Sequence, residues 1–183
     1  MRNYLSSSIA GALMLVATTL SPLESKADNL EKQLIRHEGY RTSTYLDTKG
    51  IPTIGVGFNL QRPDASNLLQ KVNADYNKIL QGNQKLDDSQ IMRLFRYDLS
   101  NAVINARQIV KTFDKQPPQV QEVIVNMTFN LGPGGLKKFK KMINAVDSND
   151  YATAAHEMKD SIWYTQVGNR SKELVQLMQN AKR

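Results

Sequence analysis

Apolar residues recur every three or four positions along most of the chain. This spacing lines one face of an α-helix, so the pattern predicts a mainly helical protein. Capping residues divide the helical pattern into separate helices. Asp64, Asp87 and Asp150 can each cap a following helix, and Pro118 can open one. The predicted helices cover residues 31–38, 65–72, 88–103, 118–131, 136–146, 151–158 and 171–180.

The pattern changes between residues 39 and 60. Two short segments, 43–46 and 52–58, hold β-branched and aromatic residues on either side of the turn Asp-Thr-Lys-Gly at 47–50. Such segments around a turn predict a β-hairpin. One hairpin among many helices indicates the α+β fold class. The helix over 118–131 is apolar on most faces, which predicts a buried centre for the helical part.

Two carboxylates stand at the ends of these elements. Glu38 closes the predicted helix 31–38, which Asp28 or Asn29 can cap, because glycine at position 39 ends helices at little cost. Asp47 opens the hairpin turn. Carboxylates on two separate elements can frame a cleft, as glycoside hydrolysis requires. Each also has an ordinary interpretation, as a solvent-exposed helix end or as a turn aspartate that accepts backbone N–H bonds.

The motifs around these carboxylates resemble a known family. Glu38, Asp47 and Thr53 follow the pattern Glu-x8-Asp-x5-Thr within HEG…YLDTKGIPTIGVGF. Further matches, to the central helix and the C-terminal segment of that family, lie in VIVNMTFNLGPGGLKKF and SIWYTQVGNRSKELV. In the order and approximate spacing of these motifs, the chain resembles the phage-type lysozymes, the T4-lysozyme-like muramidases of glycoside hydrolase family 24.

This resemblance implies a lysozyme-like α+β fold, in which a small lobe with the Glu38 helix and the hairpin faces a larger all-helical lobe across a cleft. It implies hydrolysis of the β-1,4 bond between N-acetylmuramic acid and N-acetylglucosamine in peptidoglycan. Glu38 would be the general acid, and Asp47, aided by Thr53, would activate or hold the attacking water. The family pattern also implies inversion, for which the carboxyl groups stand about 6.5–9.5 Å apart.

The resemblance also assigns residues near the cleft. Gln166, Asn169 and Arg170 match family positions there, which makes them candidates for substrate binding. Arg170 would pair with Glu38 and hold its orientation.

Two features depart from the best-known family member. Phe58 stands where that protein has a histidine in a structural ion pair, so the local packing must differ. The family's long helix between the lobes is expected after residue 64, but residues 73–75 and 82–83 can interrupt it.

The first 27 residues have the layout of a secretory signal peptide. Arg2 supplies positive charge, residues 9–20 form an uncharged and mostly apolar run, and small residues precede Asp28. We therefore expect cleavage after Ala27 and export of a lysozyme domain, residues 28–183, to the periplasm or the extracellular space. A retained anchor at residues 1–27 is the alternative, although the run is shorter than the about 20 residues of a membrane-spanning helix. Membrane contact is expected only through this segment.

Composition narrows the chemistry further. The absence of cysteine excludes disulfides and thiolate nucleophiles. The two histidines, His37 and His156, lack the spacing of zinc ligands, so neither a metal nor another cofactor is expected. The formal net charge of +7 attracts polyanions. We expect peptidoglycan glycan strands as the partner, no nucleic acid, and a monomer. The lysines within residues 137–141 form either a solvated face or a wall-binding one.

Three other functions fit parts of this pattern. A lytic transglycosylase uses a single glutamate and closes an anhydro ring without water, and the presence of both Asp47 and Thr53 argues against it. A non-catalytic peptidoglycan-binding module would keep the fold without the activity. A secreted nucleic-acid binder would rest on basic charge alone, and its binding to DNA would vanish with salt.

Overall fold

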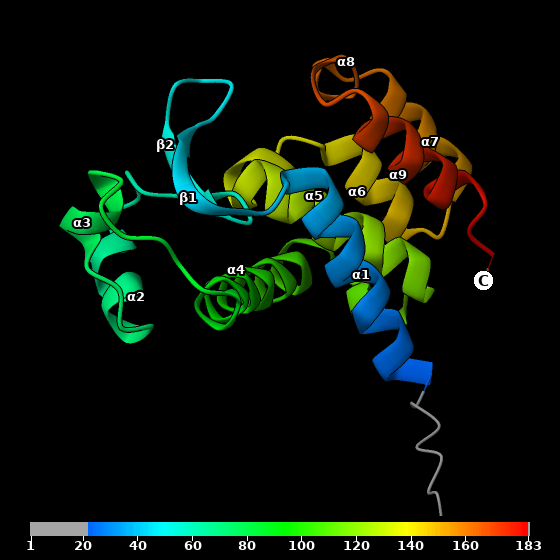
Figure 1. Cartoon of the computed structure of the whole chain (residues 1–183). Coiled ribbons are helices and arrows are strands. Elements are labelled where there is room, and N and C mark those ends of the chain that lie inside the picture. Colours follow the sequence, from blue (N-terminus) through cyan, green and yellow to red (C-terminus); the bar gives the residue numbers. More distant parts are fainter. Residues whose placement is uncertain (1–21, 183) are drawn as a thin grey trace, which may run out of the picture.

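The computed structural model describes residues 22–182, which form two lobes (Figure 1). The smaller lobe contains a three-stranded antiparallel sheet of order β1-β2-β3 together with two short helices, and one longer helix precedes it. These elements are α1 (Pro22–Glu38), β1 (Arg41–Leu46), β2 (Pro52–Gly55), β3 (Phe58–Asn59), α2 (Ala65–Lys71) and α3 (Tyr76–Leu80).

The larger lobe is helical, and α5 is its buried centre. Val123, Ile124 and Met127 of this helix are fully buried, as the apolar run at 118–131 predicts. The regular part of α5 stops at Gly132, whose φ of 67° and ψ of 169° are not helical. The elements here are α4 (Asp88–Ile109), η1 (Phe113–Lys115), α5 (Pro118–Leu136), α6 (Lys140–Asp147), α7 (Tyr151–Lys159), α8 (Ile162–Gln166) and α9 (Asn169–Gln179).

Helix α4 connects the two lobes (Figure 1). Its N-terminal half contributes Ile91 and Phe95 to the core of the small lobe, and its C-terminal half contributes Ala102 and Ala106 to the core of the helical lobe. The connecting helix is therefore continuous over 22 residues, and it begins at Asp88 rather than soon after residue 64. The expected interruptions fall before it, where they separate the short helices α2 and α3 from each other and from α4.

Helix α1 touches both lobes. It packs against α5, while its Leu34 is buried in the core of the small lobe and Leu30 packs against both cores. Glu38 at its C-terminal end is thereby held at the junction of the two lobes. The helix begins at Pro22, so the predicted start near residue 28 is wrong.

The hairpin forms as predicted. Strands β1 and β2 pair antiparallel, with Tyr45 opposite Thr53 and Leu46 opposite Pro52. The second predicted strand, 52–58, is interrupted, because Gly55 and Gly57 both adopt positive φ and turn the chain into β3. Glycine takes up this conformation with the least strain, which favours the turn from β2 into β3 at these two positions.

Other boundaries differ by a few residues. The predicted helix 136–146 starts later, at the first residue of α6, and the last helix starts two residues earlier than predicted. The side chains of Asp87 and Asp150 cap α4 and α7 as predicted. Asp64 occupies the N-cap position of α2 but makes no capping bond, because its carboxylate accepts hydrogen bonds from Arg62 instead.

The packing around Phe58 uses an ion pair of its own. Phe58 is buried, and the guanidinium of Arg62 lies 5.0 Å from the centre of its ring. Arg62 Nη1 also donates to Asp98 Oδ1 on α4 at 2.7 Å. Burial raises the pKa of the Asp98 carboxyl above its ordinary value, although the hydrogen bond from Arg62 opposes that rise. An arginine thus links the small lobe to the connecting helix.

Residues 1–21 of the predicted signal peptide lie outside the described residues, and residues 22–27 belong to α1. Across 22–182, no helix combines the length and the apolar character needed to cross a membrane.

Candidate active site

Glu38 is the acidic residue at the centre of the candidate site. It is the last residue of α1, and Gly39, with a φ of 83°, turns the chain away behind it. Its side chain keeps 19% of its surface exposed, whereas that of Arg170 keeps 7%. Arg170 Nη1 donates to Glu38 Oε1 at 2.7 Å. The pairing expected from the family resemblance is therefore present, and it fixes one oxygen of the carboxylate.

The other carboxylate oxygen lies against Gly57. A Cβ atom built on Gly57 would stand 3.1 Å from Glu38 Oε2, which is closer than ordinary contact. The absence of a side chain at this position is what leaves room for Oε2. Gly57 comes from the small lobe and Arg170 from α9, so each lobe contributes one neighbour of the Glu38 carboxylate.

Asp47 is held by its own turn. Its Oδ1 accepts the backbone N–H groups of Lys49 and Ile51, both at 2.8 Å. The turn is closed further by a hydrogen bond from Gly50 N to the Asp47 carbonyl. The ordinary interpretation of a turn aspartate is thus correct, and it also fixes the direction of the carboxylate.

Thr53 is in β2, as predicted, and is 4% exposed. Its hydroxyl donates to the Ile51 carbonyl at 3.0 Å, so the lone pairs of the hydroxyl oxygen are what it can offer a water. Tyr45 lies opposite Thr53 in the sheet. Burial raises the pKa of the Tyr45 hydroxyl above its ordinary value, and the negative charges of Glu38 and Asp47 raise it further. The charges of both carboxylates therefore act on the Tyr45 hydroxyl. The pairing of Tyr45 with Thr53 across the hairpin was the signal from which Tyr45 could have been predicted near the site.

A cleft of about 380 Å³ opens beside Gly57. The small lobe contributes Gly57, Asn59 and Arg62 to its lining, and the helical lobe contributes Asn105 and Phe129 among others. It thus lies between the lobes, and Gly57 is the lining residue that also lies against Glu38, whereas Glu38, Asp47 and Thr53 do not line it. Amide side chains and one aromatic ring are the groups with which proteins commonly hold sugars through hydroxyl hydrogen bonds and apolar contact.

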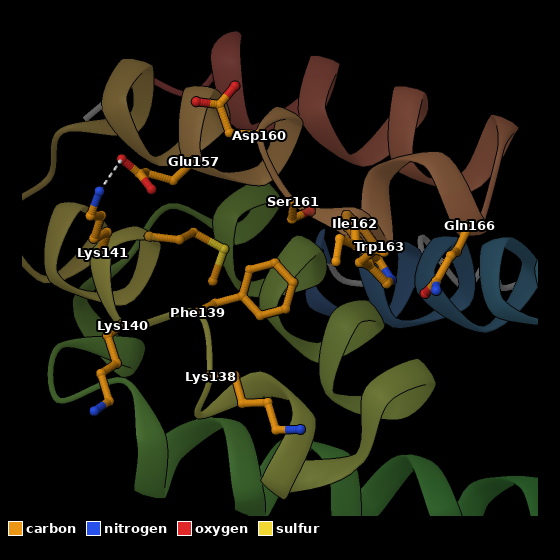
Figure 2. Close-up of a pocket in the computed structure, with 11 residues that line it drawn as sticks. Lys138, Phe139, Lys140, Lys141, Glu157, Asp160, Ser161, Ile162, Trp163 and Gln166 are labelled. Atoms are coloured by element: carbon orange, nitrogen blue, oxygen red, sulfur yellow. Dashed lines mark ion pairs between the residues drawn. The ribbon is translucent and has the colours of Figure 1, made fainter.

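Gln166 lies in a different hollow, shown in Figure 2. This second hollow has a volume of about 750 Å³ and combines the apolar side chains of Phe139 and Trp163 with Lys138, Lys140 and Lys141. The rings of Phe139 and Trp163 meet edge to face at 6.1 Å. Gln166 and Asn169 are both exposed. Of the three predicted binding residues, only Arg170 contacts Glu38 in the described part of the chain.

A buried polar network stands behind Arg170. Arg170 Nε donates to Asn126 Oδ1 at 2.8 Å, and Asn126 is fully buried in the middle of α5. Asn126 in turn contacts Gln33 and His37 on α1. The sequence pattern did not identify Asn126 or Gln33 as part of the site, nor the contact between His37 and Asn126. An amide inside an otherwise apolar helix was the available signal, because buried amides require partners.

No group of three or more histidine, cysteine or acidic side chains suited to a metal ion occurs in the described part of the chain.

The fold and the site together define a two-lobed, lysozyme-like protein with one clamped glutamate at the junction of its lobes. The family described as phage lysozyme matches residues 35–180. The chain therefore belongs to the phage lysozyme family, and it is an enzyme of the lysozyme type.

Individual relatives agree with this assignment. The probable T4-type lysozymes 1 and 2 of Dictyostelium discoideum are 28% and 26% identical to the chain, and they align with 81% and 82% of it and with 92% and 94% of their own lengths. The pre-baseplate central spike protein Gp5 of Enterobacteria phage T4 is 27% identical over 82% of this chain, and the chain spans 27% of that longer protein.

Proposed function

We propose that this protein is a muramidase that hydrolyses the β-1,4 bond between N-acetylmuramic acid and N-acetylglucosamine in peptidoglycan. The observation that carries the proposal is the state of Glu38. One of its oxygens is clamped by Arg170, and the other lies against Gly57, which lines the cleft between the lobes. Membership in the phage lysozyme family supports the same chemistry.

In this mechanism Glu38 is the general acid. A proton on Oε2 passes to the glycosidic oxygen as the bond from that oxygen to C1 of the sugar breaks. Glu38 is left as a carboxylate, and Arg170 stabilises that charge through Oε1.

Asp47 and Thr53 handle the water. With Asp47 Oδ1 occupied by two backbone N–H groups, Oδ2 is the oxygen that accepts a proton from the attacking water. The Thr53 hydroxyl accepts a hydrogen bond from the same water, since its own proton is used on Ile51. The water oxygen attacks C1 opposite the leaving group, so the first product has the inverted anomeric configuration.

The second hollow extends this reading to the peptide part of the substrate. Lys138, Lys140 and Lys141 stand around its apolar floor together with Glu157 and Asp160, and among the described residues Lys141 is the one of these lysines that forms an ion pair, with Glu157 at 4.0 Å. The free carboxylates of peptidoglycan stem peptides complement such a rim.

The test is mass spectrometry of the fragments released from purified peptidoglycan by the full chain and by Glu38→Gln. We expect reducing N-acetylmuramic acid ends with the parent protein and none with the variant. Anhydro-muramic products would instead make the protein a lytic transglycosylase, in which Asp47 is only a turn residue. Binding without any product from the parent protein would leave a non-catalytic module.

We further propose that residues 1–27 export the enzyme to the periplasm or the extracellular space and that the mature protein is a monomer. The charge and apolar pattern of this segment supports export. The intact mass of protein recovered from periplasm and medium tests it, with Asp28 expected as the first residue. Analytical ultracentrifugation of the same material tests the monomer.

A further inference from the structure

Three side chains form a continuous chain from Glu38 into the protein. Arg170 joins Glu38 to Asn126, with its Nη1 on Glu38 Oε1 and its Nε on Asn126 Oδ1. Arg170 Nη2 is buried and has no hydrogen-bond partner in the described part of the chain. The orientation of the guanidinium therefore depends on two contacts, one to the acid and one to the amide of Asn126.

The amide of Asn126 has only one orientation that fits its neighbours. Arg170 is a donor only, so the atom facing it must be the amide oxygen. The amide nitrogen then faces the other way, where it donates to Gln33 Oε1 at 2.7 Å and lies 3.3 Å from His37 Nδ1. Both N–H groups and the oxygen of this fully buried amide are thereby used.

This orientation determines the protonation of His37. Because Asn126 donates toward His37 Nδ1, that nitrogen must accept and cannot carry a proton. The proton of the neutral ring is then on Nε2, which lies 3.0 Å from Glu173 Oε2. His37 points away from the cleft into this network, although it is the sequence neighbour of Glu38.

The groups facing His37 come from three helices. Glu173 on α9 faces Nε2, and Asn126 on α5 faces Nδ1. From α1 itself, Gln33 and Arg36 reach the same Glu173 carboxylate, at 3.1 Å and 2.6 Å. The side chain of His37 is 7% exposed, so water does not readily replace a lost partner.

We infer that Asn126 and the Nε2–H form of His37 are positioning residues that hold Arg170 on Glu38, and that a second proton on His37 disconnects them. A proton on Nδ1 would set an N–H group against the NH₂ group of Asn126. Turning the amide over would relieve that contact, but it would then set the NH₂ group against Arg170. Either outcome leaves a donor facing a donor inside the protein, and the clamp on Glu38 loosens as the pH falls.

The first test reads the tautomer directly and does not depend on activity. Long-range ¹H–¹⁵N correlation spectra of the uniformly labelled full chain contain two imidazoles, because His37 and His156 are the only histidines. At neutral pH, His37 is expected to show a protonated Nε2 and an unprotonated Nδ1, and exposed His156 serves as the internal reference. A proton on His37 Nδ1 at neutral pH would overturn the inference.

The second test uses activity and rests on the proposed function of Glu38. His37→Gln can accept from Asn126 or donate to Glu173 without titrating, so its activity relative to the parent enzyme should rise as the pH falls. Asn126→Leu should lower kcat about tenfold with little change in KM, as expected for loss of a hydrogen bond to a charged group. The control is His156→Gln, which should change nothing.

The outcomes separate the two proposals. If His37→Gln has the same acid limb as the parent enzyme, His37 does not control the clamp. If Glu38→Gln remains active, the proposed catalytic role of Glu38 fails, while the tautomer of His37 can still be read from the spectra. Thermal melts of both variants identify a loss of activity caused by unfolding, and in that case the spectra of the parent protein decide.

Discussion

Replacing Gly57 with alanine tests the arrangement of the site most directly. The residue has a φ of 68°, and the new Cβ would lie 3.1 Å from Glu38 Oε2. A left-handed conformation costs a residue other than glycine about 1–2 kcal/mol. The contact adds a second effect, because Oε2 must move by a few tenths of an ångström while Arg170 restrains Oε1 at 2.7 Å.

These two effects have different readouts. The backbone strain should lower the midpoint of thermal unfolding by about 2–8 °C for a chain of this size. The displacement of Glu38 should lower kcat between about ten-fold and a hundred-fold, since small misplacements of a catalytic group are costly. Activity is measured as turbidity loss of a purified peptidoglycan suspension well below the unfolding temperature.

Gly82→Ala is the matched control. Gly82 has a φ of 75°, and nothing lies within 4 Å of a Cβ built on it. It should show a similar loss of stability with unchanged kcat. If the two variants lose stability and activity equally, or if Gly57→Ala is fully active, then Gly57 does not create the space for Glu38 Oε2.

Three further changes have defined outcomes. Arg62→Met should destabilise the fold by about 2 kcal/mol, because it leaves Asp98 partly buried without its partner, and adding Asp98→Leu should recover most of that loss, as urea unfolding can measure. Glu173→Gln should destabilise at neutral pH but not in acid. Burial raises the pKa of Glu173, but hydrogen bonds from His37, Gln33 and Arg36 outweigh it and keep that pKa below its ordinary value. The stabilisation is therefore present above the pH of about 4 at which an unfolded glutamate titrates, and it is lost as the pH falls through the folded-state pKa. Replacing Lys140 and Lys141 with alanine should weaken the binding of the protein to peptidoglycan, measured by cosedimentation, and should reduce the salt dependence of that binding.

Each of these has an opposing result. An Arg62→Met protein as stable as the parent would make the link to Asp98 energetically neutral. A constant difference between Glu173→Gln and the parent across the pH range would exclude ionisation as its cause. Lys85 is an exposed lysine outside the second hollow. If Lys85→Ala lowered cosedimentation with peptidoglycan by the same amount, the effect of the lysines would come from the overall positive charge and not from the hollow.

The local features of this protein could be predicted from its sequence. The hairpin, the caps at Asp87 and Asp150, and the buried run in α5 each depend on residues close together in the chain. The pairing of Arg170 with Glu38 spans 132 residues and was expected only through the family resemblance. Such elements can be predicted because residues close together in the sequence are sufficient to determine their conformation.

The network behind Glu38 could not be predicted in the same way. Asn126 contacts Gln33 across 93 residues and Arg170 across 44, so its partners depend on how three helices pack. The pattern also placed the start of α1 just after an N-cap at residue 28 or 29, and the family resemblance placed the connecting helix after residue 64. Those positions depend on the packing of α1 on α5 and of α4 on both cores, which local propensity does not encode.

The two carboxylates are held by separate parts of the fold, and this separation has a measurable consequence. Glu38 depends on Arg170 from α9, whereas Asp47 depends on backbone N–H groups of its own turn, and the two share no hydrogen-bond partner in the described part of the chain. The changes in unfolding free energy caused by Glu38→Gln and by Asp47→Asn should therefore add in the double variant, within about 0.5 kcal/mol. If Glu38 and Asp47 are the acid and the base of one reaction, as proposed, their losses of kcat should not add, because removing either one already abolishes the step that both serve. Additive losses of kcat would mean that Asp47 acts outside the step in which Glu38 gives up its proton.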